Sequence, residues 1–320
     1  MNLMLQGPPI RARATSLMAL LLSLSLLAPT LAAADAPGGP EESEQPTFTE
    51  ALWTFVLDAP YLPIPWPTET LTRNIPLEDA FGKLEFEVAG INVDMTPTKH
   101  TVFLWLSALL CVLLFIPARR KYDKQGVPSS KGANFIEALV LFVRDEMAIA
   151  NIGRKEGPRY VPFLLTAFFL ILFMNLLSLV PYGAAATGNL AVTGALALMT
   201  FVMTQIAGMR AHGPVGYWAG LVPSGVPWFL YPIMVPIEIM ALFTKPFALT
   251  VRLFANMTAG KVVIFSLIGL IFLFESVVVS PISVAFTLFI LVLKLFVSFL
   301  QAFVFTMLSS LFIGMASHAH

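Results

Sequence analysis

Five long stretches of apolar residues, separated by shorter polar segments, occupy the chain from about residue 101 to its end. An α-helix needs about 20 such residues to cross the hydrocarbon core of a bilayer. We therefore predict an all-α polytopic membrane protein with about five membrane-crossing helices, at residues 101–118, 161–181, 187–209, 228–263 and 280–315.

The last two stretches are too long for one perpendicular crossing, so they must tilt or lie partly in the membrane plane. We expect a hairpin-like pair of long helices, with proline residues as places to bend, at Pro232, Pro236, Pro246 and Pro281. Residues 132–152 have helical periodicity with Glu137, Arg144 and Asp145 on one side, which indicates a helix on the cytoplasmic interface. Residues 211–227 are rich in Gly and Pro and predict a cytoplasmic loop.

The N-terminal part has a different composition. Residues 1–34 combine a basic start, a short apolar run and small residues before Asp35, which is typical of a secretory signal peptide. An uncleaved membrane helix is the alternative, disfavoured by the short run and by Pro29. Residues 35–100 would be an exported segment, with an acidic tail, a short amphipathic helix near 47–58 and an irregular or small β segment near 83–93, and residues 101–320 would be the membrane domain.

The basic cluster Arg119-Arg120-Lys121 follows the first span and is expected in the cytoplasm. Five crossings then place the N-terminus outside and the C-terminus in the cytoplasm. The chain is 57% hydrophobic and 12% charged, with a mean hydropathy of +0.81. Its net charge of zero offers no basic surface for nucleic acid.

The chemistry that the chain lacks narrows its function. The single cysteine, Cys111, leaves no disulfide framework and no cysteine-based metal site. There is no phosphate-binding glycine loop and no set of nucleophile and base. We expect no metal, no cofactor and no enzymatic activity by this chain alone.

Arg252 is the most informative residue, because it lies within an apolar stretch. Placing a guanidinium in a bilayer costs roughly 2.5–3.5 kcal/mol on insertion scales, and arginine does not shed its proton to avoid that cost. A snorkelling anchor is the structural alternative. An intramembrane charge is otherwise a functional-site hypothesis.

Polar residues recur at helical spacing around it. Glu238, Lys245 and Arg252 are seven residues apart, and Asn256 follows one turn later. Residues seven apart return to within about 20° of the same helix face. Lys294, Ser298 and Gln301 form a second such stripe on the last helix, although interhelical hydrogen bonds would account for Ser298 equally well. A proton relay needs a series of acids or histidines, whereas the stripe holds one carboxylate, so a further carboxylate is expected from another subunit.

These residues resemble the subunit a family of bacterial F-type ATP synthases from about residue 95 onward. The resemblance is carried by Phe173-Met-Asn-Leu-Leu, Lys245-Pro246, Arg252-Leu-Phe-Ala-Asn-Met-Thr-Ala-Gly260, Leu300-Gln-Ala-Phe303 and Met315-Ala-Ser317. It implies the stator of the membrane proton channel, with two offset half-channels that load and unload protons on carboxylates of a rotating c-ring. The implied partners are subunit c and the subunit b peripheral stalk, in a large hetero-oligomeric complex of the bacterial inner membrane.

The resemblance also implies residue roles. Arg252 would be the essential charge facing the c-ring carboxylate, Asn256 and Gln301 its polar neighbours, and Glu238 a cytoplasmic-side channel carboxylate. The family usually has an acid or histidine where this chain has Lys261 and Lys294. We expect Glu275, between the two long helices, to be the acid that separates these lysines in the outer half-channel.

Two other functions remain open. A stand-alone proton-coupled secondary transporter would be active as the purified polypeptide. A non-transporting assembly or anchoring protein would tolerate Arg252→Lys.

Overall fold

The computed structural model describes residues 56–65, 72–82, 85–88, 91–94, 96–120, 131–180, 183–220, 228–274 and 279–318. Within them, five helices are long and apolar enough to cross a membrane: α4 (Lys99–Arg120), α7 (Gly157–Leu177), α8 (Leu190–His212), α10 (Tyr231–Phe274) and α11 (Val279–His318). The predicted all-α polytopic fold is thus confirmed. The predicted signal peptide, the acidic tail, most of the helix near 47–58 and Glu275 lie outside the described residues.

The two long helices are longer than their predicted spans. α10 has 44 residues and α11 has 40, which at about 1.5 Å per residue correspond to roughly 66 and 60 Å. α10 runs on past Lys261 to Phe274 because its sequence stays apolar there. Pro236 and Pro246 lie inside α10, where a missing backbone donor permits bending.

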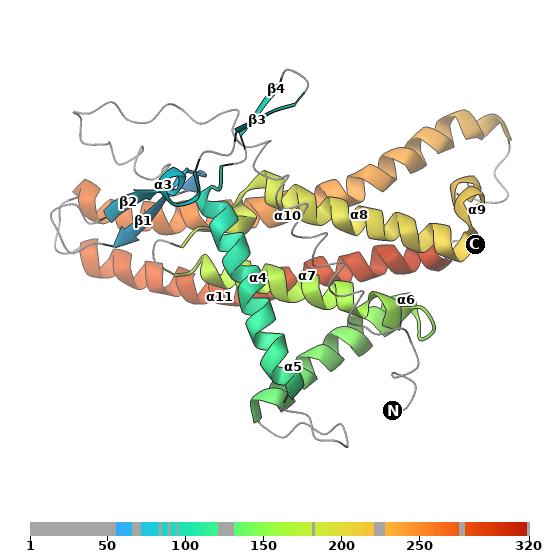
Figure 1. Cartoon of the computed structure of the whole chain (residues 1–320), viewed down its shortest axis with the longest axis horizontal. Coiled ribbons are helices and arrows are strands. Elements are labelled where there is room, and N and C mark those ends of the chain that lie inside the picture. Colours follow the sequence, from blue (N-terminus) through green and yellow to red (C-terminus); the bar gives the residue numbers. More distant parts are fainter. Residues whose placement is uncertain are drawn as a thin grey trace.

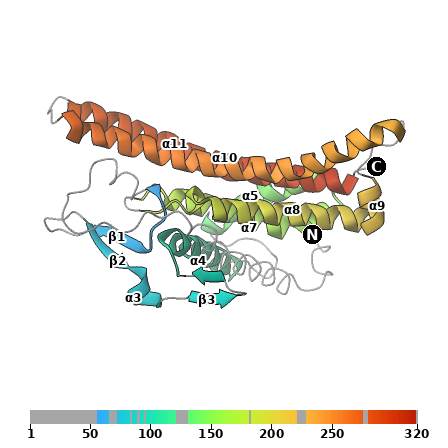
Figure 2. The ribbon, with the colours of Figure 1, turned by 90° about the horizontal axis from the view of Figure 1, so that it is seen from above.

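The helices form layers. α10 and α11 lie side by side as one curved layer, α7 and α8 lie beneath it, and α4 lies beneath them (Figure 2). The outer face of the α10–α11 layer, turned away from α7 and α8, is concave (Figure 2). α4 runs across the direction of the other four long helices (Figure 1). The helices therefore cannot all stand upright in one bilayer, in agreement with the predicted tilt.

The buried core lies among α4, α7 and α11. Its largest fully buried side chains include Phe168, Phe169 and Phe305. Phe115 of α4 meets Phe169 of α7 edge-on, with ring centroids 4.9 Å apart. Because lipid is as apolar as these side chains, such packing contacts hold the helices together.

The interfacial segment predicted as one helix over 132–152 has a break in its helical geometry. It comprises α5 (Lys131–Phe142), the π-helical η4 (Val143–Ile149) and α6 (Ala150–Ile152). Val143 and Met147 are fully buried, and η4 packs against α7. The polar side is exposed, where Arg144 pairs with Asp145 at 2.7 Å.

Two short antiparallel pairs precede α4. β1 (Tyr61–Pro65) pairs with β2 (Thr72–Pro76), and β3 (Glu85–Val88) pairs with β4 (Ile91–Asp94), with α3 (Leu77–Phe81) between them. The second pair confirms the predicted β segment near 83–93.

The segment predicted as a loop over 211–227 begins with a helix, α9 (Pro214–Ala219). Gly213 has φ +75° and ends α8, and Pro214 then begins α9. The loop prediction is wrong for residues 214–219. It took Gly and Pro only as residues that break helices, whereas Pro is also favoured at the first position of a helix. Short 3₁₀ turns, η5 (Ala186–Gly188) and η6 (Trp228–Leu230), precede α8 and α10.

Candidate functional site

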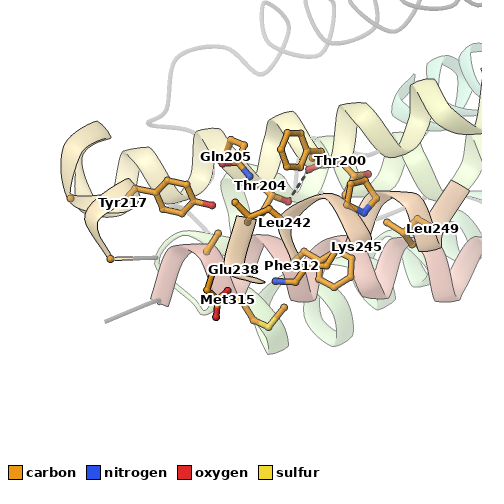
Figure 3. A pocket seen from close by; sticks show the side chains of 15 residues that line it. Thr200, Thr204, Gln205, Tyr217, Glu238, Leu242, Lys245, Leu249, Phe312 and Met315 are labelled. Atoms are coloured by element: carbon orange, nitrogen blue, oxygen red, sulfur yellow. Dashed lines mark hydrogen bonds between the residues drawn. The ribbon is translucent and has the colours of Figure 1, made fainter. Parts of the chain in front are cut away.

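Glu238 lines a cavity of about 200 Å³ near the start of α10. α8 contributes Thr200, Thr204 and Gln205 to this cavity, and α9 contributes Tyr217. Lys245 lies two turns along α10 and lines the same cavity (Figure 3). Glu238 and Lys245, which helical spacing placed on one stripe, therefore line the same cavity.

Gln205 and Tyr217 were not singled out in the sequence. The amide nitrogen and oxygen of Gln205 are buried and have no hydrogen bond of normal geometry to any described residue. The Tyr217 hydroxyl points toward Gln205 and Thr204 (Figure 3). Buried polar atoms of this kind are normally satisfied by water when the space is large enough. The sequence did offer one sign of Gln205, because it is a glutamine within an otherwise apolar span.

Arg252 lies on the exposed outer face of α10. It lines a shallow groove of about 530 Å³ together with Ile237, Met240, Thr244, Leu308 and other residues. Lys245 and Leu249 line both this groove and the Glu238 cavity. They therefore form the wall between the two spaces. The Lys245 ammonium also lies 5.7 Å from the centre of the Phe312 ring, within the range of a cation–π contact.

The Arg252 guanidinium makes no ion pair with any residue that the structure describes. Large apolar side chains are also exposed on α10 and α11, among them Met240, which lines the same groove as Arg252, and Phe247, Val292 and Phe296. An unpaired cation among exposed apolar side chains would be costly in lipid. The face is therefore suited to a partner that supplies both apolar surface and an anion.

Asn256 and Gln301 contact each other across the two long helices. Nδ2 of Asn256 on α10 donates to Oε1 of Gln301 on α11 at 3.3 Å, one turn beyond Arg252. Ser298 instead donates to the carbonyl of Lys294 in its own helix at 2.8 Å. The hydrogen bond of Ser298 is thus within its own helix, and not the interhelical bond that the sequence analysis considered.

Lys261 and Lys294 are both buried, each with 6% of its surface exposed. Nζ of Lys261 donates to the carbonyl oxygen of Gly183, in the connection between α7 and α8, at 3.1 Å. The Lys294 side chain lies across Gly260, where an added Cβ would be 3.1 Å from its Cε and 3.5 Å from its Nζ. Each lysine is thus held by a neighbouring part of the chain.

Asp58, in the segment before β1, lies near the same buried lysines. Oδ1 of Asp58 lies 2.7 Å from Nδ1 of His100, in the first turn of α4. Oδ2 of Asp58 accepts from Nδ2 of Asn189 at 2.9 Å, and Asn189 also caps α8. Asp58, Lys99 and Lys294 are the charged groups whose electrostatic interaction reaches Lys261. The structure thus places near Lys261 a carboxylate that the sequence analysis did not consider.

The ionisation of Asp58 reflects two opposing effects. Burial disfavours its charged form, but the contact with His100 and a hydrogen bond from Thr98 outweigh burial, and the pKa of Asp58 is lowered from its ordinary value. The carboxylate is therefore ionised at neutral pH, beside an imidazole that can share a proton with it.

These observations define a class of protein, a polytopic helical membrane protein. Its buried and membrane-facing ionisable side chains lie mainly on the two long helices α10 and α11, and Asp58 and His100 lie near Lys261 of α10. Comparison with known proteins refines this class. The family model of the ATP synthase A chain matches residues 101–314. ATP synthase subunit a of Myxococcus xanthus (strain DK1622) is 61% identical over 225 residues, which cover 70% of this chain and 74% of that protein.

Two further relatives agree. The subunit a of Chloroherpeton thalassium (strain ATCC 35110 / GB-78) is 50% identical over 72% of this chain and 69% of its own. That of Anaeromyxobacter sp. (strain Fw109-5) is 51% identical over 78% of this chain, and the match spans 59% of that relative. The chain belongs to the ATP synthase A chain family.

Proposed function

We propose that this chain is the stator subunit of the proton channel of an F-type ATP synthase. It provides two offset half-channels through which protons reach and leave carboxylates on a rotating c-ring, so that proton flow drives rotation and ATP synthesis. The chain itself carries no catalytic site for ATP. Its membership in the ATP synthase A chain family supports this role.

The observation that carries the proposal is the position of Arg252. Its charge is exposed in a groove lined by side chains of α10 and α11, and it has no ion-pair partner that the structure describes. The layer that α10 and α11 form is concave on its outer face (Figure 2). A convex ring of helices, each carrying one carboxylate, would match both the curvature and the charge of this face. Attraction to Arg252 would favour the ionised carboxylate and so drive release of its proton.

The fixed charge also separates the half-channels. A proton hopping between water molecules would be repelled by a guanidinium that does not lose its own proton. Protons therefore cross only when carried by the ring. Lysine cannot replace arginine fully here, because an ammonium can deprotonate and lacks the planar fork.

The cavity around Glu238 is the proposed cytoplasmic half-channel. It is lined by several polar side chains within a mostly apolar wall, is large enough for water, and is separated from the Arg252 groove by Lys245, Leu249 and Phe312. The buried lysines Lys261 and Lys294 would line the outer half-channel, together with Glu275 of the undescribed connection. The charge cluster after the first span supports an N-terminus outside and a C-terminus in the cytoplasm of a bacterial inner membrane.

Reconstitution tests this role against the alternative of a stand-alone proton-coupled transporter. Proton flux would be measured in vesicles that contain the chain alone, and in vesicles that contain it with subunit c and subunit b. A stator gives flux only with the ring present. Equal flux from the chain alone would favour the transporter.

A further inference from the structure

The structure assigns a proton-transfer role to two residues outside the predicted path: we propose that Asp58 and His100 form the entrance of the outer half-channel and pass protons toward Lys261 and Lys294. This inference rests on the proposed function. It gives the exported segment before the first span a part in proton transport.

The first support is the geometry of the pair. Asp58 and His100 are 42 residues apart in the chain, yet Oδ1 and Nδ1 are 2.7 Å apart. The Asp58 side chain keeps 17% of its surface exposed, whereas the His100 side chain is 2% exposed. The carboxylate can therefore take a proton from water, while the imidazole lies on the buried side of the contact.

The second support is what surrounds the pair. Asp58 faces His100 and Lys99 of α4, Asn189 of α8, and Lys261 of α10, with Lys294 of α11 beyond Lys261. The charge of Lys261 on α10 is close enough to act on His100 of α4. One partly exposed acid thus lies at the edge of a buried group of bases. That order, from water to acid to imidazole to amine, is what a proton relay requires.

The relay conserves protons at each transfer. The Asp58 carboxylate takes one proton from a hydronium ion, which leaves a water molecule, and gives it to Nδ1 of His100. The imidazolium that forms releases one proton from Nε2, and a neutral Lys261 or Lys294 accepts that proton and passes it to the carboxylate of the ring. Asp58 and the lysine are then as they began, whereas His100 is left with its proton on Nδ1 and must turn its ring over before the next transfer.

The structural alternative is that Asp58 only fastens the exported segment to α8 through Asn189. The two roles separate experimentally. Asp58→Asn keeps the shape and can still bond to Asn189, but an amide cannot carry the proton. Asn189→Ala removes the fastening and leaves the contact between Asp58 and His100.

The test uses the complete complex in membrane vesicles, stripped of its soluble part, with passive proton flux measured over a range of pH on the outer side. We expect Asp58→Asn to lower flux on the order of 100-fold with the subunits still assembled. Asn189→Ala should keep most of the flux. Asp79→Asn is the matched control, because Asp79 is an exposed acid of the same segment, in α3.

Asp58→Glu keeps the proposal testable if the asparagine variant does not assemble. Glutamate has a slightly higher ordinary pKa than aspartate, so a relay role predicts retained flux with a pH profile displaced toward higher pH. Wild-type flux in Asp58→Asn would overturn the inference, as would equal losses in Asp58→Asn and Asn189→Ala or an unchanged profile in Asp58→Glu. Arg252→Ala, measured by ATP-driven pumping in the complete complex before it is stripped, reports on the proposed function: if it loses pumping while Asp58→Asn keeps wild-type flux, the stator role stands without this entrance.

Discussion

Nδ1 of His100, in the first turn of α4, lies 2.7 Å from Oδ1 of Asp58, in the segment that precedes β1. This contact joins the part of the chain before the membrane domain to the first membrane helix. It also places an acid at the end of the molecule where Lys261 and Lys294 are buried. The outer side of the proposed ion path thus depends on residues that come before the first span.

The contribution of Asp58 to the stability of the folded protein should depend on pH. Its pKa is lowered in the folded protein, so its contribution to stability is complete above the ordinary aspartate pKa of about 4 and is lost as pH falls through the lower folded value. The difference in thermal stability between wild type and Asp58→Asn should be constant near neutral pH and shrink below about pH 4. A difference that instead grows on acidification would show that Asp58 is not ionised in the folded state.

Asn189 should matter for stability more than for transport. It accepts from the backbone N–H of Ala191 as the N-cap of α8 and donates to Asp58. Loss of such a cap costs about 1 kcal/mol, so Asn189→Ala should speed hydrogen exchange in the first turn of α8. Asn134→Ala, at an exposed position of α5, is the control and should leave exchange there unchanged.

Gly183 should tolerate no side chain. A Cβ there would lie 2.8 Å from the carbonyl oxygen of Val180 and would also collide with that of Leu177. Gly183→Ala must therefore move the carbonyl that accepts from Lys261, and should lower stability by roughly 1–3 kcal/mol and reduce proton flux. Gly132→Ala has open space around its Cβ and should be neutral in the same assays.

Gln205 should lower the thermal stability of the protein while it supports proton pumping. Its buried amide has no hydrogen bond of normal geometry to a described residue, and Gln205→Leu removes both unsatisfied atoms while keeping a similar volume. We expect equal or higher thermal stability but slower ATP-driven pumping, because a drier cavity hinders proton entry. Thr166→Val, in α7 and outside this cavity, is the control for pumping. Unchanged pumping in Gln205→Leu would exclude a water-filled path at this position.

The sequence alone predicted the membrane helices because each is a local pattern of apolar residues. It also placed Asn256 and Gln301 on polar stripes of the two long helices by their helical spacing, but it did not pair them with each other. The C-terminal end of α10 was predicted at residue 263 because the span was kept close to the thickness of a bilayer. An inclined helix can continue further, and α10 ends at Phe274. Asp58 and His100 could not be paired from sequence, because 42 residues separate them and the contact depends on how the segment before α4 folds back onto that helix. The adjacent Lys99 and His100, at the start of an apolar span, were the one available signal.

The central claim is that Arg252 is the fixed charge between two half-channels, and ATP-driven proton pumping in inverted membrane vesicles tests it most directly. Arg252→Lys and Arg252→Ala would be compared with wild type, with assembly checked by co-purification of subunit c. We predict that both variants assemble and neither pumps. Assembled Arg252→Lys that pumps at the wild-type rate would contradict the account and leave Arg252 with a structural role.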